Sequence, residues 1–325
     1  MVIAVAKRPV PMHRVRPHAL EGLRRSDGTI DWSPWYLTEE EDMGQSGEQG
    51  QIIDVLQSSL QVLAGQRGWS SVLVASDNFF AWVDGEPYVQ VSPDVYLLDN
   101  PPGPDEPMPG RWEVWRPEHS VPRFVVEIVS ARWKKDYEIN PARYDHLGVS
   151  ELVLADRDAF VRTSQQGMRS GVAAEQSGRV RGGRGLVSEP ASAAGHSRAA
   201  GHSIGRDTIA IDRVPLSVYR RSAADRLELA YAGNGPAFCA ELDAYLCFKQ
   251  SSPGRPRVRI SRDPAGNDIV PTLIESRTAA EERASAAEER ASAAEEQAAE
   301  ARREAAAQAA EIAALRNRLR DPQES

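Results

Sequence analysis

The C-terminal part of the chain repeats a seven-residue unit. The segment AAEERAS occupies residues 279–285, returns unchanged at 286–292, and returns in altered form at 293–299. Apolar residues spaced alternately four and three apart form one stripe of a helix, as the a and d positions of a coiled coil do. The pattern predicts a helix from about Ser276 to Arg320, within a helical tail over residues 275–325 that projects away from the folded part.

Most of this stripe is alanine, from Ala280 to Ala305. Alanine buries little apolar area, so this part of the stripe can contribute little to association. Ile312, Leu315 and Leu319 are its large members. Two interpretations stay open: a homodimer through residues 305–320, and a solvated single helix.

Two further stretches lack a hydrophobic period. Residues 165–206 are dominated by Gly, Ser, Ala and Arg, which cannot bury enough apolar surface to offset the entropy of ordering. We therefore predict a disordered insertion there, and a loosely ordered N-terminal arm over residues 1–45. A single domain built from residues 46–164 and 207–274 remains.

Within this domain, a helix precedes a set of short strands. Ser46 to Gln49 fits a capping box, and apolar residues follow at helical spacing from Ile52 to Leu63. Runs rich in β-formers follow at 71–75, 79–83, 88–91, 94–98, 123–129, 151–155, 209–220 and 227–232, and residues 236–248 and 257–260 complete the domain. The proline-rich segment 100–122 is expected to be a loop, and Asn140-Pro141 to begin a short helix that ends at Gly148. The predicted class is α/β (α+β), a mixed sheet flanked by helices.

Charge and composition exclude several functions. The net charge of -8 argues against coating nucleic acid by bulk electrostatics, although a locally basic cleft stays possible. The two cysteines offer neither a disulfide framework nor a zinc-ligand spacing. Without a long apolar run or a signal peptide pattern, the chain is expected to be cytoplasmic and not to bind a membrane. Phosphate-loop, nucleophile-elbow and zinc-protease motifs are absent from the sequence.

Three acidic residues stand where chemistry could occur. Glu127 lies inside an apolar strand, where a carboxylate is costly unless it has a partner, and Asp94 follows Pro93 at the head of another strand. Glu48 lies on the first helix. Each also has a structural interpretation: an ion pair with an arginine for Glu127, a strand-start residue for Asp94, and an acid favoured by the helix dipole for Glu48.

The order of these motifs resembles that of a known family. Ser92-Pro93-Asp94-Val95 is followed by Val125-Val126-Glu127-Ile128-Val129-Ser130, by Asp136 with Tyr144 eight residues later, and by residues 148–156 with the sequence GVSELVLAD. This arrangement over residues 46–156 is similar to the putative restriction endonuclease family of the PD-(D/E)XK nuclease superfamily, with a fainter likeness over 215–271. The resemblance implies a restriction-endonuclease-like fold and hydrolysis of DNA phosphodiester bonds.

The resemblance also implies a metal site. Asp94 and Glu127 would hold Mg²⁺ or Mn²⁺, the backbone carbonyl of Ile128 would complete the inner set of ligands, and Glu48 could contribute through a water. We expect Asp94 and Glu127 on adjacent strands, about 4 to 6 Å apart. Burial and Asp94 should both raise the pKa of Glu127.

The chain departs from the family where a lysine is expected. Val129 stands two residues after Glu127, and Asn140 stands on the following helix, in the two positions where lysine is usual. Lys134, Lys135 and Arg143 are the available substitutes, and Lys135 is the first choice as catalytic residue. The alternative function is a catalytically degenerate nuclease fold that binds nucleic acid or protein through its helical tail.

Overall fold

The fold is described from a computed structural model of the chain. The structure describes residues 23–37, 47–103, 106–166, 213–250 and 255–320. In the last range, side chains are described as far as residue 316. The chain divides into two compact units, Met1–Val270 and Pro271–Ser325. The first unit is a mixed α+β fold and the second contains a long helix, which confirms the predicted fold class.

A six-stranded sheet forms the centre of the first unit, in the order β1-β4-β6-β7-β8-β9. The pairing of β6 with β7 is parallel and the other four pairings are antiparallel, so the sheet is mixed. Its strands are β1 (Val72–Ala75), β4 (Val95–Asp99), β6 (Phe124–Ile128), β7 (Glu151–Ala155), β8 (Leu216–Arg221) and β9 (Leu227–Gly233).

Two smaller sheets accompany it. One has the order β3-β2-β5, and the other has the order β10-β11-β12. Their strands are β2 (Phe79–Ala81), β3 (Gln90–Val91), β5 (Arg111–Glu113), β10 (Ala237–Cys239), β11 (Ala244–Gln250) and β12 (Pro256–Ser261). β5 lies inside the segment expected to be a loop. A strand forms there because β5 pairs with β2. This pairing places the Trp112 indole in the interior, where the residue is 2% exposed.

Helix α1 (Gly47–Arg67) covers one face of the central sheet. Its apolar residues recur on one side, and Leu56 and Leu60 are fully buried there. They pack in one cluster with alternate residues of β4 and β6, including Val95 and Val126. This helix was predicted from the spacing of apolar residues between Ile52 and Leu63.

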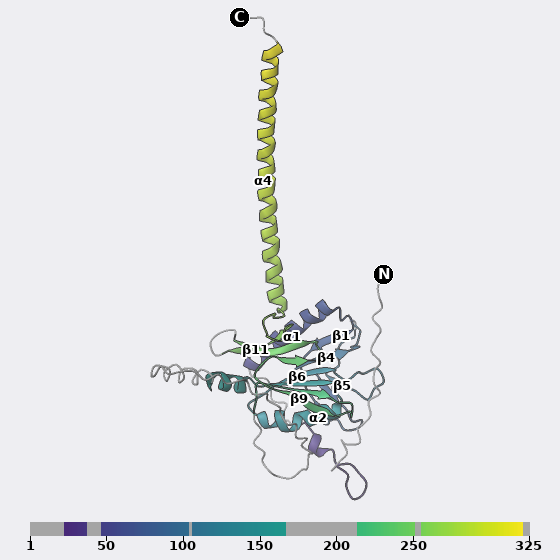
Figure 1. The fold of residues 1–325 in the computed structure, drawn as a ribbon. Coiled ribbons are helices and arrows are strands. Elements are labelled where there is room, and N and C mark those ends of the chain that lie inside the picture. Colours follow the sequence, from purple (N-terminus) through teal and green to yellow (C-terminus); the bar gives the residue numbers. More distant parts are fainter. Residues whose placement is uncertain (1–22, 38–46, 104–105, 167–212, 251–254, 321–325) are drawn as a thin grey trace, which may run out of the picture. The chain divides into compact units, whose positions relative to one another are not determined.

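The opposite face is covered by a helix with an unusual first turn (Figure 1). The π-helical turn η3 (Lys135–Ile139) leads directly into α2 (Asn140–Leu147), which ends at Gly148 in the left-handed conformation. The short helix α2 begins at Asn140 as expected, but Asn140 is already helical because the π-helical turn precedes it. The wide turn lies just before Pro141, whose ring lacks an N–H and would crowd a regular helix.

The N-terminal segment 23–37 differs from the expected loose arm. Leu23 is buried, and Trp35 and Tyr36 pack against the cluster beneath α2. The Arg143 guanidinium donates to the Tyr36 carbonyl at 2.9 Å, which ties the segment to α2. The predicted disordered insertion lies outside the described residues from residue 167 onward; residues 157–166 form a helix.

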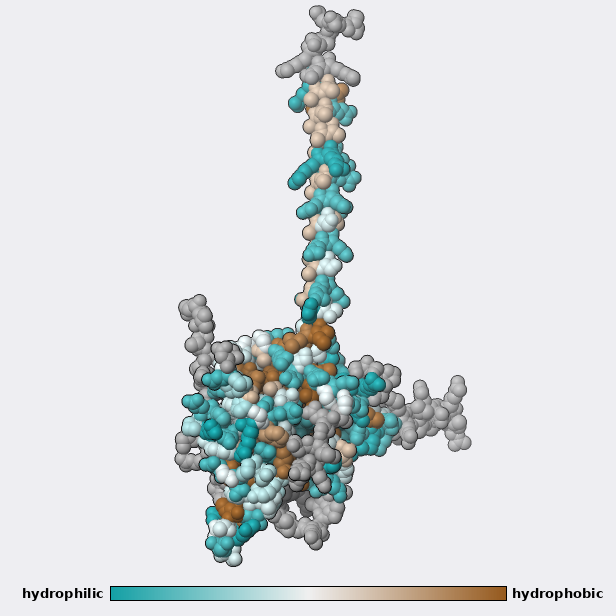
Figure 2. Space-filling model, turned by 180° about the vertical axis from the view of Figure 1, so that it is seen from behind, coloured by the Kyte–Doolittle hydropathy of each residue, from teal (hydrophilic) through white to brown (hydrophobic). Residues whose placement is uncertain are grey.

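The second unit contains helix α4 (Leu273–Arg320). Residues 301–316 are all exposed, including Ile312 and Leu315 at 51% each. Figure 2 shows charged side chains along this helix with small apolar residues between them. Among the described residues, none of the helices combines the length and apolar character needed to cross a membrane.

Candidate active site

Asp94 and Glu127 meet at the end of two neighbouring strands. The antiparallel register that pairs Val95 with Val126 places Asp94 opposite Glu127. Residues directly opposite in such a pair have Cβ atoms about 4.5–5.5 Å apart and point to the same face. Both carboxylates are 7% exposed. Two acids that are far apart in sequence therefore share one buried position on the sheet.

The face they occupy is the one beneath α2. Alternate residues of a strand point to opposite faces, and Tyr96 and Val125 belong to the cluster that contains Tyr144 of α2. Asp94 and Glu127 each stand two residues from one of these, so they point the same way. The face covered by α1 receives apolar residues from the same two strands.

Each carboxylate is oriented by neutral donors. The Ile128 N–H donates to Asp94 Oδ2 at 2.7 Å, and Gln49 Nε2 donates to Asp94 Oδ1 and Oδ2 at 3.1 and 3.2 Å. The Tyr144 hydroxyl donates to Glu127 Oε1. Because these donors come from β6, α1 and α2, three elements fix the two acids in place.

Burial makes the charged form of these acids unfavourable. Burial raises the pKa of Asp94 to about 7, even though the Ile128 N–H and the Gln49 amide lower it. The pKa of Glu127 lies well above its usual value, because of burial first and the negative charges of Asp94 and Asp136 second. This is the expected behaviour of two carboxylates held together, and such a pair gains stability from a cation.

A third acid, Asp136, holds the turn that follows β6. Its Oδ2 accepts hydrogen bonds from the Ser130 N–H at 2.8 Å and the Ser130 hydroxyl at 3.0 Å. Its Oδ1 accepts a longer bond of 3.4 Å from Asn140 Nδ2. Burial raises the pKa of Asp136, and the Ser130 donors and Lys135 lower it. Asn140, in one of the usual lysine positions, therefore serves this carboxylate as a neutral donor.

Of the three candidate cations, Lys135 is the one whose charge acts on all three acids. Its Nζ is 4.0 Å from Asp136 Oδ1, and its positive charge lowers the pKa of Asp94, Glu127 and Asp136. Lys134 instead lies over the Trp133 ring. Arg143 is turned toward the backbone of Tyr36.

Glu48 has a basic partner of its own. Its carboxylate forms an ion pair with Arg157, while the neighbouring Gln49 reaches Asp94. Sequence analysis missed the roles of Gln49 and Tyr144 in orienting the acids. The spacing of eight residues between Asp136 and Tyr144 was a sequence signal for the role of Tyr144. A glutamine in the first turn of a helix gives no such signal for the role of Gln49.

The donor set fits a hard divalent cation. Mg²⁺ takes oxygen ligands and is often held in proteins by one or two carboxylates, with water and substrate phosphate completing the shell. Among the described residues, no group of three or more His, Cys, Asp or Glu side chains is arranged to hold a metal. A cation here would therefore depend on two carboxylates, with backbone, water or substrate oxygens supplying the rest.

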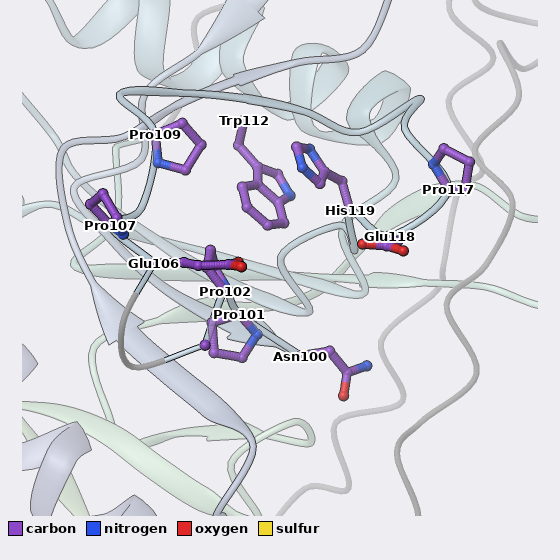
Figure 3. A pocket seen from close by; sticks show the side chains of 11 residues that line it. Asn100, Pro101, Pro102, Glu106, Pro107, Pro109, Trp112, Pro117, Glu118 and His119 are labelled. Atoms are coloured by element: carbon purple, nitrogen blue, oxygen red, sulfur yellow. The ribbon is translucent and has the colours of Figure 1, made fainter.

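The proline-rich segment contains a separate cavity of about 650 Å³ (Figure 3). Five prolines line it, and the Trp112 and His119 rings stack inside it with centroids 3.7 Å apart. Trp112 Nε1 donates to the Ser120 carbonyl at 2.8 Å, which fixes the indole. Asp94, Glu127 and Asp136 are not among its lining residues. The cavity and the acidic site are therefore distinct.

The comparison with known families agrees with this geometry. Residues 39–177 match the Uma2 family. Uma2 is described as a putative restriction endonuclease family, so the resemblance noted from the motifs is confirmed over this segment. The Uma2 match covers α1, the strands that carry Asp94 and Glu127, and α2. No match to the chain is found among curated proteins.

Proposed function

We propose that the protein is a metal-dependent endonuclease that hydrolyses DNA phosphodiester bonds. The observation that carries the proposal is the pair Asp94 and Glu127, buried side by side and oriented by neutral donors. A buried pair of acids without a basic partner is costly, so a structural role alone gives no reason for it. The Uma2 match supports a nuclease, and the paired acids support the metal dependence.

In this proposal, Asp94 and Glu127 hold Mg²⁺ or Mn²⁺, with the Ile128 carbonyl as a further ligand. When bound, the cation polarises a phosphoryl oxygen and lowers the pKa of a bound water. The chain's own contribution is orientation: Gln49 and the Ile128 N–H fix Asp94, and Tyr144 fixes Glu127.

Lys135 supplies the positive charge that the usual lysine positions lack. Its charge already acts on all three acids of the site. An ammonium group there would stabilise negative charge on the phosphate while water attacks phosphorus and the P–O bond to the leaving oxygen breaks. The attacking water gives up a proton to solvent and the leaving oxygen takes one from a second water, so the step balances while Lys135 keeps its charge.

One observation favours the alternative of a degenerate fold that binds without cleaving. Val129 is half-buried and packs against the cluster beneath α2, so an apolar side chain fills the position after Glu127 where lysine is usual. In that case the protein would bind nucleic acid or a partner protein, with the tail as its working surface.

Nicking of supercoiled plasmid tests the proposal. Wild-type protein with Mg²⁺ or Mn²⁺ should convert supercoiled plasmid to the open circle, and EDTA should stop the reaction. Glu127→Gln should lower the rate at least a hundredfold, because it removes a metal ligand while keeping the side-chain shape. Glu48→Gln is the matched control, since Glu48 is paired with Arg157 and should be dispensable. A wild-type protein that binds DNA but never nicks it supports the degenerate fold instead.

A further inference from the structure

Lysine is rare in this chain, and its distribution is uneven. The chain has 39 basic residues, of which four are lysines: Lys7, Lys134, Lys135 and Lys249. Two of the four stand together in the turn that follows β6, within eight residues of Glu127. Lys135 lies beside the acids, which leaves Lys134 without a role in the proposed chemistry.

The turn that carries Lys134 is fixed to the end of β6. Asp136 accepts hydrogen bonds from both the backbone and the hydroxyl of Ser130. The Lys135 N–H donates to the Arg132 carbonyl at 3.0 Å, and the Arg132 N–H donates to the Ser130 hydroxyl at 3.1 Å. The backbone around Lys134 is therefore held in one conformation relative to Glu127.

Trp133 is also held in place. The Arg213 guanidinium lies 5.3 Å from the centre of its ring, and the Tyr137 ring meets it edge-on at 6.4 Å. Arg213 and Tyr137 both bond to the buried carboxylate of Asp156, with Arg213 making bonds of 2.6 and 2.8 Å. The indole is thus a rigid platform beside the site.

Lys134 is exposed on this platform. Its Nζ lies 5.9 Å from the centre of the Trp133 ring, within the range of a cation–π contact. Within the described part of the chain, Lys134 has no carboxylate partner. The three acids nearby make the site negative, so an approaching phosphate chain needs positive charge around it.

We propose that Lys134, presented on Trp133, binds a backbone phosphate of the nucleic acid next to the one that is cut. It is a positioning residue: it fixes the strand against the site and does not touch the reacting phosphate. The contact recognises phosphate and not base, so it is independent of sequence. This inference rests on the proposed nuclease function, because it assumes that nucleic acid approaches the acids.

Fluorescence anisotropy of a labelled DNA duplex, with EDTA present to prevent cleavage, tests the contact apart from catalysis. Lys134→Ala should weaken binding roughly fivefold and reduce the slope of log Kd against log salt by about one. Trp133→Ala should weaken binding similarly, because it removes the platform, and Lys134→Arg should restore most of the affinity. Lys249→Ala is the matched control, since Lys249 lies on β11 in another sheet.

The outcomes separate the two proposals. If Lys134→Ala binds with the affinity and salt slope of wild type and of Lys249→Ala, the contact does not exist, even if the wild-type protein nicks plasmid. The same holds if the wild-type protein binds no DNA. If Lys134→Ala weakens binding while the wild-type protein never nicks, the contact stands and the nuclease proposal fails.

Discussion

The two faces of the central sheet are built from the same strands and differ in what those strands bury. On β6, Val126 points to the face covered by α1, where its neighbours are apolar throughout the cluster. Glu127, the next residue, points to the face beneath α2 and is also buried there. A period of two thus places a packing surface and a chemical site on one pair of strands. Both faces bury an apolar cluster, but the face beneath α2 also holds the buried acids, whose charged form lowers stability.

Truncation of the α1 face should give the largest effect on stability. Leu56 is fully buried in the cluster beneath α1, so Leu56→Ala leaves a cavity and should lower the free energy of unfolding by about 3 kcal/mol. Urea unfolding monitored by circular dichroism measures the change. The shift in Tm caused by a divalent cation should persist in this variant, since the acids lie on the other face. A loss below about 1 kcal/mol would contradict the division of roles.

Removal of an acid from the α2 face should act in the opposite direction. The pKa of Asp94 is raised from its ordinary value to about 7, so the folded protein binds this proton more tightly than the unfolded chain. Ionising Asp94 in the folded state therefore lowers the free energy of unfolding. This loss is absent below the unfolded pKa near 4, grows as pH rises, and is complete above pH 7. Asp94→Asn should therefore raise the free energy of unfolding by about 2 kcal/mol at pH 8 without divalent cations.

Urea unfolding of Asp94→Asn and wild type at pH 5 and pH 8 checks the sign, because the difference between them should be smaller at pH 5. Asp243→Asn is a control: its side chain is 74% exposed in an ion pair with Arg67. Its effect should be small at both pH values. Destabilisation of Asp94→Asn at pH 8 would mean that the carboxylate is structural.

Protonation of Asp94 should also weaken cation binding, which is the third and smaller expected effect. A carboxylate must lose its proton to bind a metal, and the pKa of Asp94 is about 7 in the absence of metal. Affinity for Mn²⁺ should therefore fall by roughly tenfold per pH unit below that value. Titration calorimetry at pH 6 and pH 8 measures the change. Equal affinity at both pH values would place the cation elsewhere.

The sequence predicted what depends on periodic residues. The 3.6-residue spacing from Ile52 to Leu63 identified α1, because one helical face must meet the core. The costly position of Glu127 in an apolar strand identified the buried acid. The register that brings Asp94 opposite Glu127 follows from the antiparallel pairing of β4 with β6, which was inferred only through the family resemblance.

Other features depend on contacts that no local pattern encodes. Asn140-Pro141 has the composition of a helix start, but the turn held by Asp136 and Ser130 already continues the helix through it. Trp112 forms a strand because β2 lies beside it. Gln49 orients Asp94 because the first turn of α1 lies near the start of β4, a fact of tertiary structure alone.

We expect the smallest effect in the tail. The question there is whether an exposed apolar stripe contributes to association. In α4 the stripe is exposed, and Ile312 and Leu315 are its large described side chains. Replacing Ile312, Leu315 and Leu319 with Ser should weaken any dimer measured by sedimentation, since large apolar residues fill coiled-coil seams. Replacing Ala284, Ala287 and Ala291 with Ser should change it little, because alanine buries little area. If the alanine variant is the disruptive one, close packing of the alanine seam forms the interface. A monomer at every accessible concentration would mean that α4 is a solvated single helix. Its apolar residues would then recur periodically without forming a dimer interface.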